Sequence, residues 1–275
     1  MRKSCGHYPV TRNIIISDSI IQLTFKADDI SRSTVPGQFI QIRVSDNFIP
    51  LWPRPFSIYD VDTRKGEISI IFKVAGYGTG LLAGKKEGDT IQILGPLGNG
   101  FPIPSNDGGM VMAAGGTGMP PLFLLSKFAI ENGVPSSSIT FISGARTRTE
   151  LFEPVELTEL ETDLNVCTDD GSAGEKGTVV DMLEKILENK SGFTIYACGP
   201  VGMLKKIDRL LLEKNIPGFL SLEELMPCGY GICSGCAVKV LPSPDRGETD
   251  DNRDYHLKRV CVEGPVFESG EVMWE

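Results

Sequence analysis

The sequence lacks two features that would direct it to a membrane or to nucleic acid. Its long stretch without charged residues, Met110 to Ser126, is interrupted by three glycines and by Pro120-Pro121, whereas a membrane-spanning helix needs about 20 consecutive apolar residues. Acidic residues outnumber basic ones by 36 to 27, which gives a net charge of −9. Because nucleic-acid binding depends on basic patches that contact phosphates, we expect neither a membrane nor a nucleic acid as a partner.

The sequence also lacks the marks of an exported, disulfide-bonded protein. Its first residues, Met1 to His7, are basic but include no apolar segment of the kind found in signal peptides. The number of cysteines, seven, is odd, and four of them form one spaced pattern. Such usage fits a reducing compartment better than a disulfide framework. We therefore predict a cytoplasmic protein, and its 275 residues leave room for two or three domains.

The most specific pattern that is present is a group of cysteines near the C-terminus. Cys228, Cys233 and Cys236 are spaced C-x4-C-x2-C, and Cys261 follows further along. This is the plant-type spacing of a [2Fe–2S] cluster held by four thiolates. The glycines between and beside these cysteines allow the backbone to bend tightly around a cluster. Zinc ligands usually come as two close pairs, and a thiol–disulfide pair at Cys233 and Cys236 would be expected beside a βαβ unit. The pattern favours the cluster over both alternatives.

The fourth ligand is assigned to Cys261, with His256 as the alternative. His256 lies five residues upstream of Cys261, and some [2Fe–2S] centres with raised potentials have mixed cysteine and histidine ligands.

The first part of the chain is predicted to consist of short antiparallel strands. Apolar residues alternate in 38–44 and 66–74, and similar patterns occupy 14–25 and 89–94. Turn signals such as Pro36-Gly37 separate them. Short strands with turns and almost no helical period are typical of a closed antiparallel barrel, which we assign to residues 1–103.

Two motifs inside this barrel have the chemistry of a nucleotide site. Arg54-Pro55-Phe56-Ser57 offers an arginine fork suited to a pyrophosphate and a hydroxyl suited to a flavin edge. By itself it could be only a rigid turn with a surface arginine. The glycine-rich turn Gly76 to Leu82 then opens a short predicted helix, where backbone N–H groups form an anion site.

From Gly108 the pattern changes to alternating strands and helices. The apolar run 109–114 leads into Gly115-Gly116-Thr117-Gly118 and a helix that begins with prolines, the layout of a phosphate cradle. Further strands are predicted at 138–143, 164–168 and 193–197, and helices at 154–161, 179–188 and 201–214. This alternation predicts a parallel sheet covered on both faces, which we assign to residues 104–220. Ligands bind such sheets beyond the carboxyl ends of the strands, where the chain places 115–118, 144–148, 169–171 and 198–200.

The last part, residues 221–275, is assigned to the cluster domain. It contains a predicted strand at 237–241 and a charged, proline-containing stretch, 242–255, which we interpret as an exposed and mobile excursion.

These motifs in this order resemble the ferredoxin–NADP reductase superfamily, which joins a flavin barrel with R-P-x-S to a nicotinamide domain with G-G-T-G and C-G-P. The cysteines and the ending Cys261 to Phe267 narrow the resemblance to electron-transfer subunits of class B dihydroorotate dehydrogenase. The resemblance implies an antiparallel flavin-binding β-barrel, a parallel-sheet nicotinamide-binding α/β domain and a small C-terminal [2Fe–2S] domain. One departure is the loop between Cys236 and Cys261, which is longer than expected for that family.

The resemblance also implies the site residues. FAD would lie on the barrel, with Arg54 at its pyrophosphate and Ser57 near the isoalloxazine ring. The remaining flavin contacts would be Pro55, Phe56, Ile71, Phe72, Lys73, Gly78 and Thr79. NAD(H) would contact Gly115, Gly116, Thr117, Gly118, Arg146, Asp169, Cys198, Gly199 and Pro200. The cluster ligands would be Cys228, Cys233, Cys236 and Cys261.

Ser57 and Cys198 are the predicted catalytic residues, because the resemblance places them at the flavin and the nicotinamide. A small buried cysteine at a strand end is the alternative for Cys198. The alternative interpretation of Asp169 and Asp170 is that they only cap a loop. Glu223 is interpreted as a solvated charge rather than a flavin contact.

By resemblance, the chain passes electrons between NAD(H), FAD and the cluster, to or from an FMN-containing dihydroorotate dehydrogenase subunit in a heterotetramer. One alternative is an NAD(P)H diaphorase subunit of another complex, such as a ferredoxin-linked bifurcating oxidoreductase, a sulfide dehydrogenase or a hydrogenase. A redox sensor without turnover is the non-enzyme alternative. The family favours NADH, although Arg146 and Arg148 follow the second strand of the α/β domain, where an NADP site would place cations.

Overall fold

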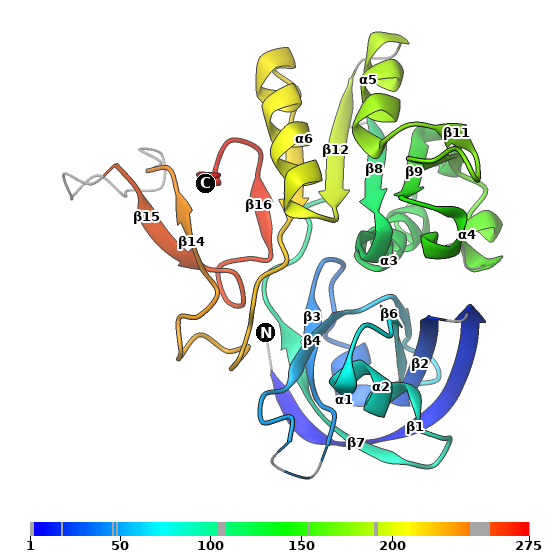
Figure 1. The fold of residues 1–275 in the computed structure, drawn as a ribbon, viewed down its shortest axis with the longest axis vertical. Coiled ribbons are helices and arrows are strands. Elements are labelled where there is room, and N and C mark those ends of the chain that lie inside the picture. Colours follow the sequence, from blue (N-terminus) through cyan, green and yellow to red (C-terminus); the bar gives the residue numbers. More distant parts are fainter. Residues whose placement is uncertain are drawn as a thin grey trace.

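The computed structural model describes residues 3–17, 19–45, 47, 49–103, 108–152, 155–189, 192–242 and 254–274. Most of the stretch predicted to be a mobile excursion, residues 243–253, lies outside this range. Figure 1 shows a curled β domain, an α/β domain above it, and a small C-terminal segment beside both. No helix within the described ranges is long and apolar enough to span a membrane.

The N-terminal domain is a seven-stranded antiparallel sheet that curls around an apolar core. Its strand order is β4-β3-β7-β1-β2-β6-β5, with α1 and α2 beside it (Figure 1). The bounds are β1 Ser4–Ser17, β2 Ile20–Lys26, α1 Asp28–Ser31, β3 Phe39–Arg43, β4 Arg54–Ser57, β5 Asp60–Asp62, β6 Glu67–Lys73, α2 Tyr77–Ala83 and β7 Thr90–Leu97.

Two details of this domain differ from the sequence prediction. The apolar pattern at 14–25 belongs to two strands, β1 and β2, which pair with each other as antiparallel neighbours. Periodicity misses this reversal because apolar residues continue on both sides of it. In addition, the strand order has two edges, β4 and β5, so the sheet is an open half-barrel rather than a closed one. The edge position of β4 accommodates Pro55, which cannot donate a ladder hydrogen bond.

The second domain has a sheet in the order β11-β10-β9-β8-β12-β13-β16, parallel except for β16. Its strands are β8 Gly109–Gly115, β9 Ile139–Ala145, β10 Asp163–Thr168, β11 Glu175–Lys176, β12 Phe193–Cys198 and β13 Gly218–Ser221. Its helices are α3 Met119–Glu131, α4 Val155–Glu159, α5 Val179–Asn189 and α6 Val201–Lys214, with short 3₁₀ turns η1 Gly116–Gly118, η2 Ser136–Ser138 and η3 Arg148–Glu150.

Both faces of this sheet are buried, as its continuous apolar strands require. Along β8, Val111 and Ala113 belong to the core formed with α5 and α6. The alternate residues Met110 and Met112 belong to the core on the α3 side. The predicted fold class is therefore confirmed, with a parallel sheet between two layers of helices.

The two large domains pack against each other through a shared apolar core. Tyr59 of the half-barrel stacks on Phe123 of α3, with ring centroids 4.5 Å apart, and Lys127 of α3 forms an ion pair with Asp60 of β5 at 2.5 Å. Both rings are buried. Their relative orientation is therefore fixed by apolar packing as well as by charge.

The C-terminal segment packs against both domains. Its hairpin consists of β14 Ala237–Val240 and β15 His256–Arg259, and β16 Val266–Glu268 then joins the second sheet beside β13. The buried carboxylate of Asp208 in α6 accepts hydrogen bonds from Ser269, Gly270 and Trp274. These contacts hold the end of the chain on α6.

Candidate functional site

A cavity of about 350 Å³ lies where the half-barrel, the second domain and the C-terminal segment meet. The half-barrel contributes eight of the lining residues, the second domain four, and the C-terminal segment that follows β13 the remaining five. Its lining residues are Phe39, Pro55, Phe56, Ser57, Ile71, Phe72, Lys73, Ala75, Thr117, Pro120, Cys198, Ser221, Leu222, Glu223, Glu224, Met226 and Pro265. We call it the flavin cavity, because it contains most of the residues predicted to lie near the flavin ring.

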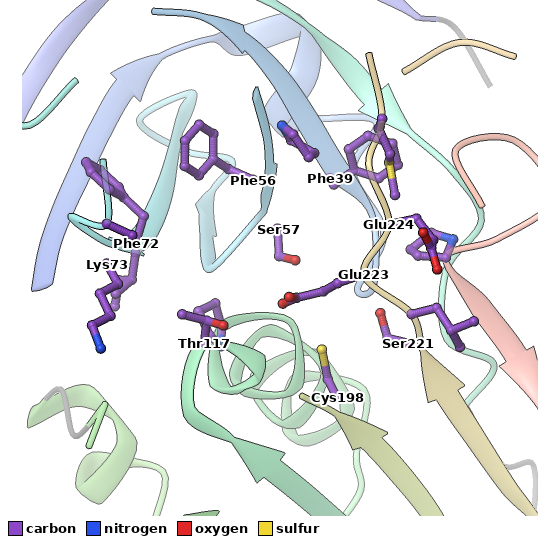
Figure 2. A pocket seen from close by; sticks show the side chains of 17 residues that line it. Phe39, Phe56, Ser57, Phe72, Lys73, Thr117, Cys198, Ser221, Glu223 and Glu224 are labelled. Atoms are coloured by element: carbon purple, nitrogen blue, oxygen red, sulfur yellow. The ribbon is translucent and has the colours of Figure 1, made fainter. Parts of the chain in front are cut away.

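Strand pairing brings the predicted flavin residues to this cavity. Ser57 lies opposite Phe39 in the β3–β4 ladder, and Ile71, Phe72 and Lys73 end strand β6. In Figure 2 the Ser57 hydroxyl, the Glu223 carboxylate and the Thr117 side chain point into the same space, with the Cys198 thiol below them. The cavity thus combines aromatic and aliphatic walls with a few polar groups, as a flavin ring requires.

The predicted phosphate end of the flavin site lies outside this cavity but is continuous in sequence with its wall. A side chain built on Gly78 would approach the Arg54 Nε to 3.5 Å, while one built on Gly76 or Gly80 would meet no protein atom within 4 Å. The Arg54 guanidinium donates a hydrogen bond to the Trp52 carbonyl at 2.8 Å. Open space over glycine backbone beside an arginine fits the diphosphate part of FAD.

The hydroxyl of Thr79 is already used within this turn. It accepts hydrogen bonds from the N–H groups of Ala75 and Gly76 and donates to the Gly76 carbonyl. Thr79 therefore shapes the glycine turn, and its role as a phosphate contact stays a prediction.

A second cavity, of about 620 Å³, opens at the carboxyl ends of the parallel strands, where an α/β sheet binds its ligand. We call it the dinucleotide cavity. Its lining residues are Lys73, Gly115, Gly116, Thr117, Gly144, Ala145, Arg146, Glu150, Phe152, Asp169, Thr178, Val179, Val180, Pro200, Gly202, Met203 and Lys206. Lys73 and Thr117 line both cavities, so the two are adjacent.

The remaining predicted nicotinamide residues lie in two loops that pack against each other. A Cβ on Gly118 would lie 2.0 Å from the Cys198 carbonyl oxygen, and one on Gly199 would lie 3.0 Å from the Gly115 Cα. The two glycine-containing loops therefore touch through bare backbone. Cys198 itself ends β12 and lines the flavin cavity.

The Cys198 thiol is held in its neutral form. Its side chain is buried, and burial together with the charge of Glu223 raises the pKa of the thiol. A protonated thiol is a poor nucleophile, so Cys198 can pack against a ligand or donate a weak hydrogen bond, but it does not provide a thiolate.

Glu223, interpreted from the sequence as a solvated charge, is exposed but also lines the flavin cavity. Partial burial of its carboxylate there raises its pKa, and a hydrogen bond with Thr117 opposes that effect. The signal that could have found it is its position, two residues beyond the end of β13, at the ligand-binding edge of the sheet.

The structure also separates the two arginines that follow β9. Arg146 lines the dinucleotide cavity, and its guanidinium donates two hydrogen bonds to Glu150, at 2.8 and 2.9 Å. Arg148 does not line either cavity, and its backbone N–H donates to Ser172. Asp169 lines the dinucleotide cavity near Arg146, because its backbone N–H donates to the Ala145 carbonyl.

The cysteines of the cluster segment lie close enough to influence one another's ionisation. Cys233 opposes the effect of burial on the pKa of Cys228, whereas burial, Cys236 and the charge of Cys228 all raise the pKa of Cys261. Such mutual influence is expected of four side chains that would share one [2Fe–2S] cluster. Among the residues that the structure describes, no three histidine, cysteine or acidic side chains converge on one point as they would around a single metal ion.

The loop between these cysteines directs backbone N–H groups at sulfur. Burial alone would raise the pKa of Cys228, but hydrogen bonds from the N–H groups of Cys233, Tyr230 and Ile232 lower it to about 6. Gly231 makes this loop possible, because its φ of +90° favours glycine and a Cβ there would lie 2.6 Å from Val262. The donor set therefore suits anionic sulfur ligands.

Comparisons with known proteins agree with this geometry. Residues 223–273 match the family model "Iron-sulfur cluster binding domain of dihydroorotate dehydrogenase B". Residues 112–209 match an oxidoreductase NAD-binding domain, and residues 7–101 an oxidoreductase FAD-binding domain. The chain is 37% identical over 261 residues to the dihydroorotate dehydrogenase B (NAD(+)) electron transfer subunit of Desulforamulus reducens, covering 95% of each. The chain belongs to this family.

A second relative with the same description, from Bacillus velezensis, is 39% identical over 97% of this chain and 98% of its own length. The predicted family and the predicted cofactors, FAD, NAD(H) and a [2Fe–2S] cluster, are thereby confirmed, as is the assignment to NAD-dependent flavin and iron–sulfur oxidoreductases. The roles of individual site residues and the domain boundaries stay predictions.

Solved structures place this electron transfer subunit family in a wider fold group. An NADH-dependent reduced ferredoxin–NADP oxidoreductase has a TM-score of 0.82 and 31% identity, over 97% of this chain and 90% of that one. The ferredoxin reductase of carbazole 1,9a-dioxygenase, at 18% identity and a TM-score of 0.68, shares the fold over 78% of this chain and 67% of its own.

Proposed function

We propose that the chain passes electrons between NAD(H) and an FMN-containing dihydroorotate dehydrogenase subunit, with which it forms a heterotetramer. The observation that carries this proposal is that the three candidate cofactor sites are contiguous. Lys73 and Thr117 join the dinucleotide cavity to the flavin cavity, and Met226 and Pro265, from the two arms of the cluster segment, line the flavin cavity.

The contact between flavin cavity and cluster loop is a rigid one. The buried Gln41 side chain in β3 donates a hydrogen bond to the Met226 carbonyl at 2.8 Å, and Cys228 follows two residues later. When bound, FAD would supply the chemistry that links two-electron exchange with NAD(H) to single-electron exchange with the cluster. The chain's own part is to hold these three sites in line and to keep water away from them.

Within the flavin cavity, the polar groups have separate proposed roles. Ser57 offers a hydroxyl that can donate or accept at a flavin edge, and the Glu223 carboxylate points into the same space (Figure 2). Cys198, as a neutral thiol, would pack against the nicotinamide. These groups lie at the junction of both domains, which is where the two rings must meet for hydride transfer.

The test uses the chain with and without its partner. The anaerobically reconstituted protein alone should reduce a dye with NADH but show no activity on dihydroorotate. Addition of the FMN subunit should create NAD-linked interconversion of dihydroorotate and orotate, measured as orotate formation. The proposal would be contradicted if the chain reduced the dye normally but formed no orotate when the FMN subunit was added. Copurification with a ferredoxin-linked subunit would instead support the bifurcating oxidoreductase, which the 31% identical structure makes the second candidate.

Nucleotide choice provides a further prediction. An acidic residue at the ribose favours NAD over NADP. Asp169 lines the dinucleotide cavity, whereas Arg148 does not, and Arg146, which does, is paired with Glu150. We expect kcat/KM for NADH to exceed that for NADPH by about tenfold or more, since repulsion of a 2′-phosphate by one nearby carboxylate costs on the order of 1–2 kcal/mol.

Asp169→Ser should reduce that ratio severalfold by improving the use of NADPH. Arg148→Ala, a matched change in the neighbouring loop, should leave it unaltered. A preference for NADPH in the unmodified protein, lost in Arg148→Ala, would show instead that the arginine selects the nucleotide.

A further inference from the structure

Glu150 connects cations from the two nucleotide domains. Its carboxylate accepts a hydrogen bond from the Lys73 Nζ at 2.8 Å, and from the Arg146 Nε and Nη2 at 2.9 and 2.8 Å. Lys73 ends strand β6 of the half-barrel, whereas Arg146 follows β9 of the second domain. The hydrogen bonds from Arg146 and then Lys73 lower the pKa of Glu150 to about 2, so the carboxylate is charged at any physiological pH.

All three residues line the dinucleotide cavity. The other charged residues of its lining are Asp169 and Lys206, so the cavity has three cations and two anions. A dinucleotide brings a pyrophosphate with two negative charges, which binds through cations and backbone N–H groups. Glu150 therefore occupies the two cations, Lys73 and Arg146, that would otherwise be available to that pyrophosphate.

Joining the two domains is not a sufficient reason for this carboxylate. The stacked Tyr59 and Phe123 rings and the Lys127–Asp60 ion pair already connect the domains. Both aromatic rings are buried, whereas the side chains of Glu150, Lys73 and Arg146 are 24%, 34% and 75% exposed. The Arg146–Glu150 pair is largely solvated and contributes little to stability, and the part-buried Lys73–Glu150 pair adds to a docking contact that the buried rings already make. This leaves the charge of the cavity as the further effect of Glu150.

We propose that Glu150 is an internal counter-anion that competes with the dinucleotide pyrophosphate for Lys73 and Arg146. It thereby weakens the binding of NAD(H) and speeds its exchange at the site where electrons enter or leave. This inference rests on the proposed function in one respect, that the cavity binds NAD(H). Glu150 acts through the two cations and is a positioning residue.

The test measures NAD⁺ and ADP-ribose binding to the intact, FAD-loaded chain by calorimetry. Glu150→Gln keeps the shape of the side chain but removes its charge. It should tighten the binding of both ligands about three- to tenfold, because removing one unit charge from a partly solvated site changes the binding constant by about that factor. The gain should shrink as salt is raised, because the newly available cations are screened. In turnover with a dye, KM for NADH should fall more than kcat changes.

Three variants make the result specific. Glu150→Asp, which keeps the charge, should bind as the unmodified chain does. Lys73→Met should weaken binding. Glu213→Gln, at the exposed end of α6, removes the same charge outside the cavity and should change nothing. The absorption spectrum of bound FAD verifies that each variant is folded.

Two outcomes separate this inference from the proposed function. If the unmodified chain binds NAD⁺ and Glu150→Gln binds it equally or more weakly, Glu150 is only a structural link and the inference is overturned. If the unmodified, FAD-loaded chain binds neither NAD⁺ nor ADP-ribose, the NAD(H) site itself is wrong.

Discussion

Replacing Cys261 by alanine should remove the iron–sulfur cluster and abolish electron transfer to the partner subunit. Cys261 is fully buried beside Cys236, so no solvent ligand can readily take its place. The visible absorption of the cluster and its electron paramagnetic resonance signal should both be lost. Reduction of a dye by NADH should largely survive, because hydride transfer from NADH to FAD precedes the cluster.

The matched control is His256→Ala. His256 lies in β15 opposite Val240. Its Nε2 is buried without a hydrogen-bond partner among the described residues, so His256 is the alternative to Cys261 as the fourth cluster ligand. We expect the cluster spectrum to be unchanged in His256→Ala. A cluster that is lost in His256→Ala and retained in Cys261→Ala would mean mixed cysteine and histidine ligation. Coupled orotate formation in a cluster-free variant would rule out the proposed electron path.

Gly118→Ala should be among the most damaging single-methyl changes in the second domain. The added Cβ would lie 2.0 Å from the Cys198 carbonyl oxygen and 2.7 Å from the Gly199 nitrogen. These are backbone atoms at the end of a buried strand, and they cannot rotate away. Overpacking of this kind costs about 3 kcal/mol or more, which lowers the melting temperature by roughly 6–12 °C for a protein of this size. Displacement of the loops should also weaken NAD⁺ binding.

Thermal unfolding followed by circular dichroism, together with NAD⁺ calorimetry, tests this expectation. Gly84→Ala is the control, because Gly84 has a φ of −77° and its nearest contact would be at 3.6 Å. It should shift the melting temperature little. Equal melting temperatures for the two variants would show that the loops at Gly118 and Cys198 do not touch through their backbones.

Much of the molecule was predictable from local patterns. The predicted strands at 38–44 and 66–74 correspond to β3 and β6, and the predicted helices at 179–188 and 201–214 to α5 and α6. Period-2 and period-3.6 patterns reflect which side of an element is buried, and these elements each have a clearly apolar side. The pattern at 14–25 was misread as one strand because both β1 and β2 are apolar where they meet.

The sequence alone determined the family, the cofactors and the cluster cysteines, because each depends on residues close together in the chain. Each of these motifs is a short backbone segment that fixes the positions of its own functional groups. The motifs are C-x4-C-x2-C, Arg54 to Ser57 and Gly115 to Gly118. The fit of such groups to a cluster, a flavin or a phosphate is therefore readable without a fold.

Only the tertiary structure decided which groups from distant segments share a site. Glu223 approaches Thr117 in the flavin cavity, and Glu150 pairs with Lys73, 77 residues away in sequence. It also showed that Arg146 is paired with Glu150 and that Arg148 lies outside both cavities. The physical reason is that ion pairs and cavity walls depend on how the two sheets pack together, and that packing is set by buried contacts such as Tyr59 on Phe123, which leave no pattern in the neighbouring sequence.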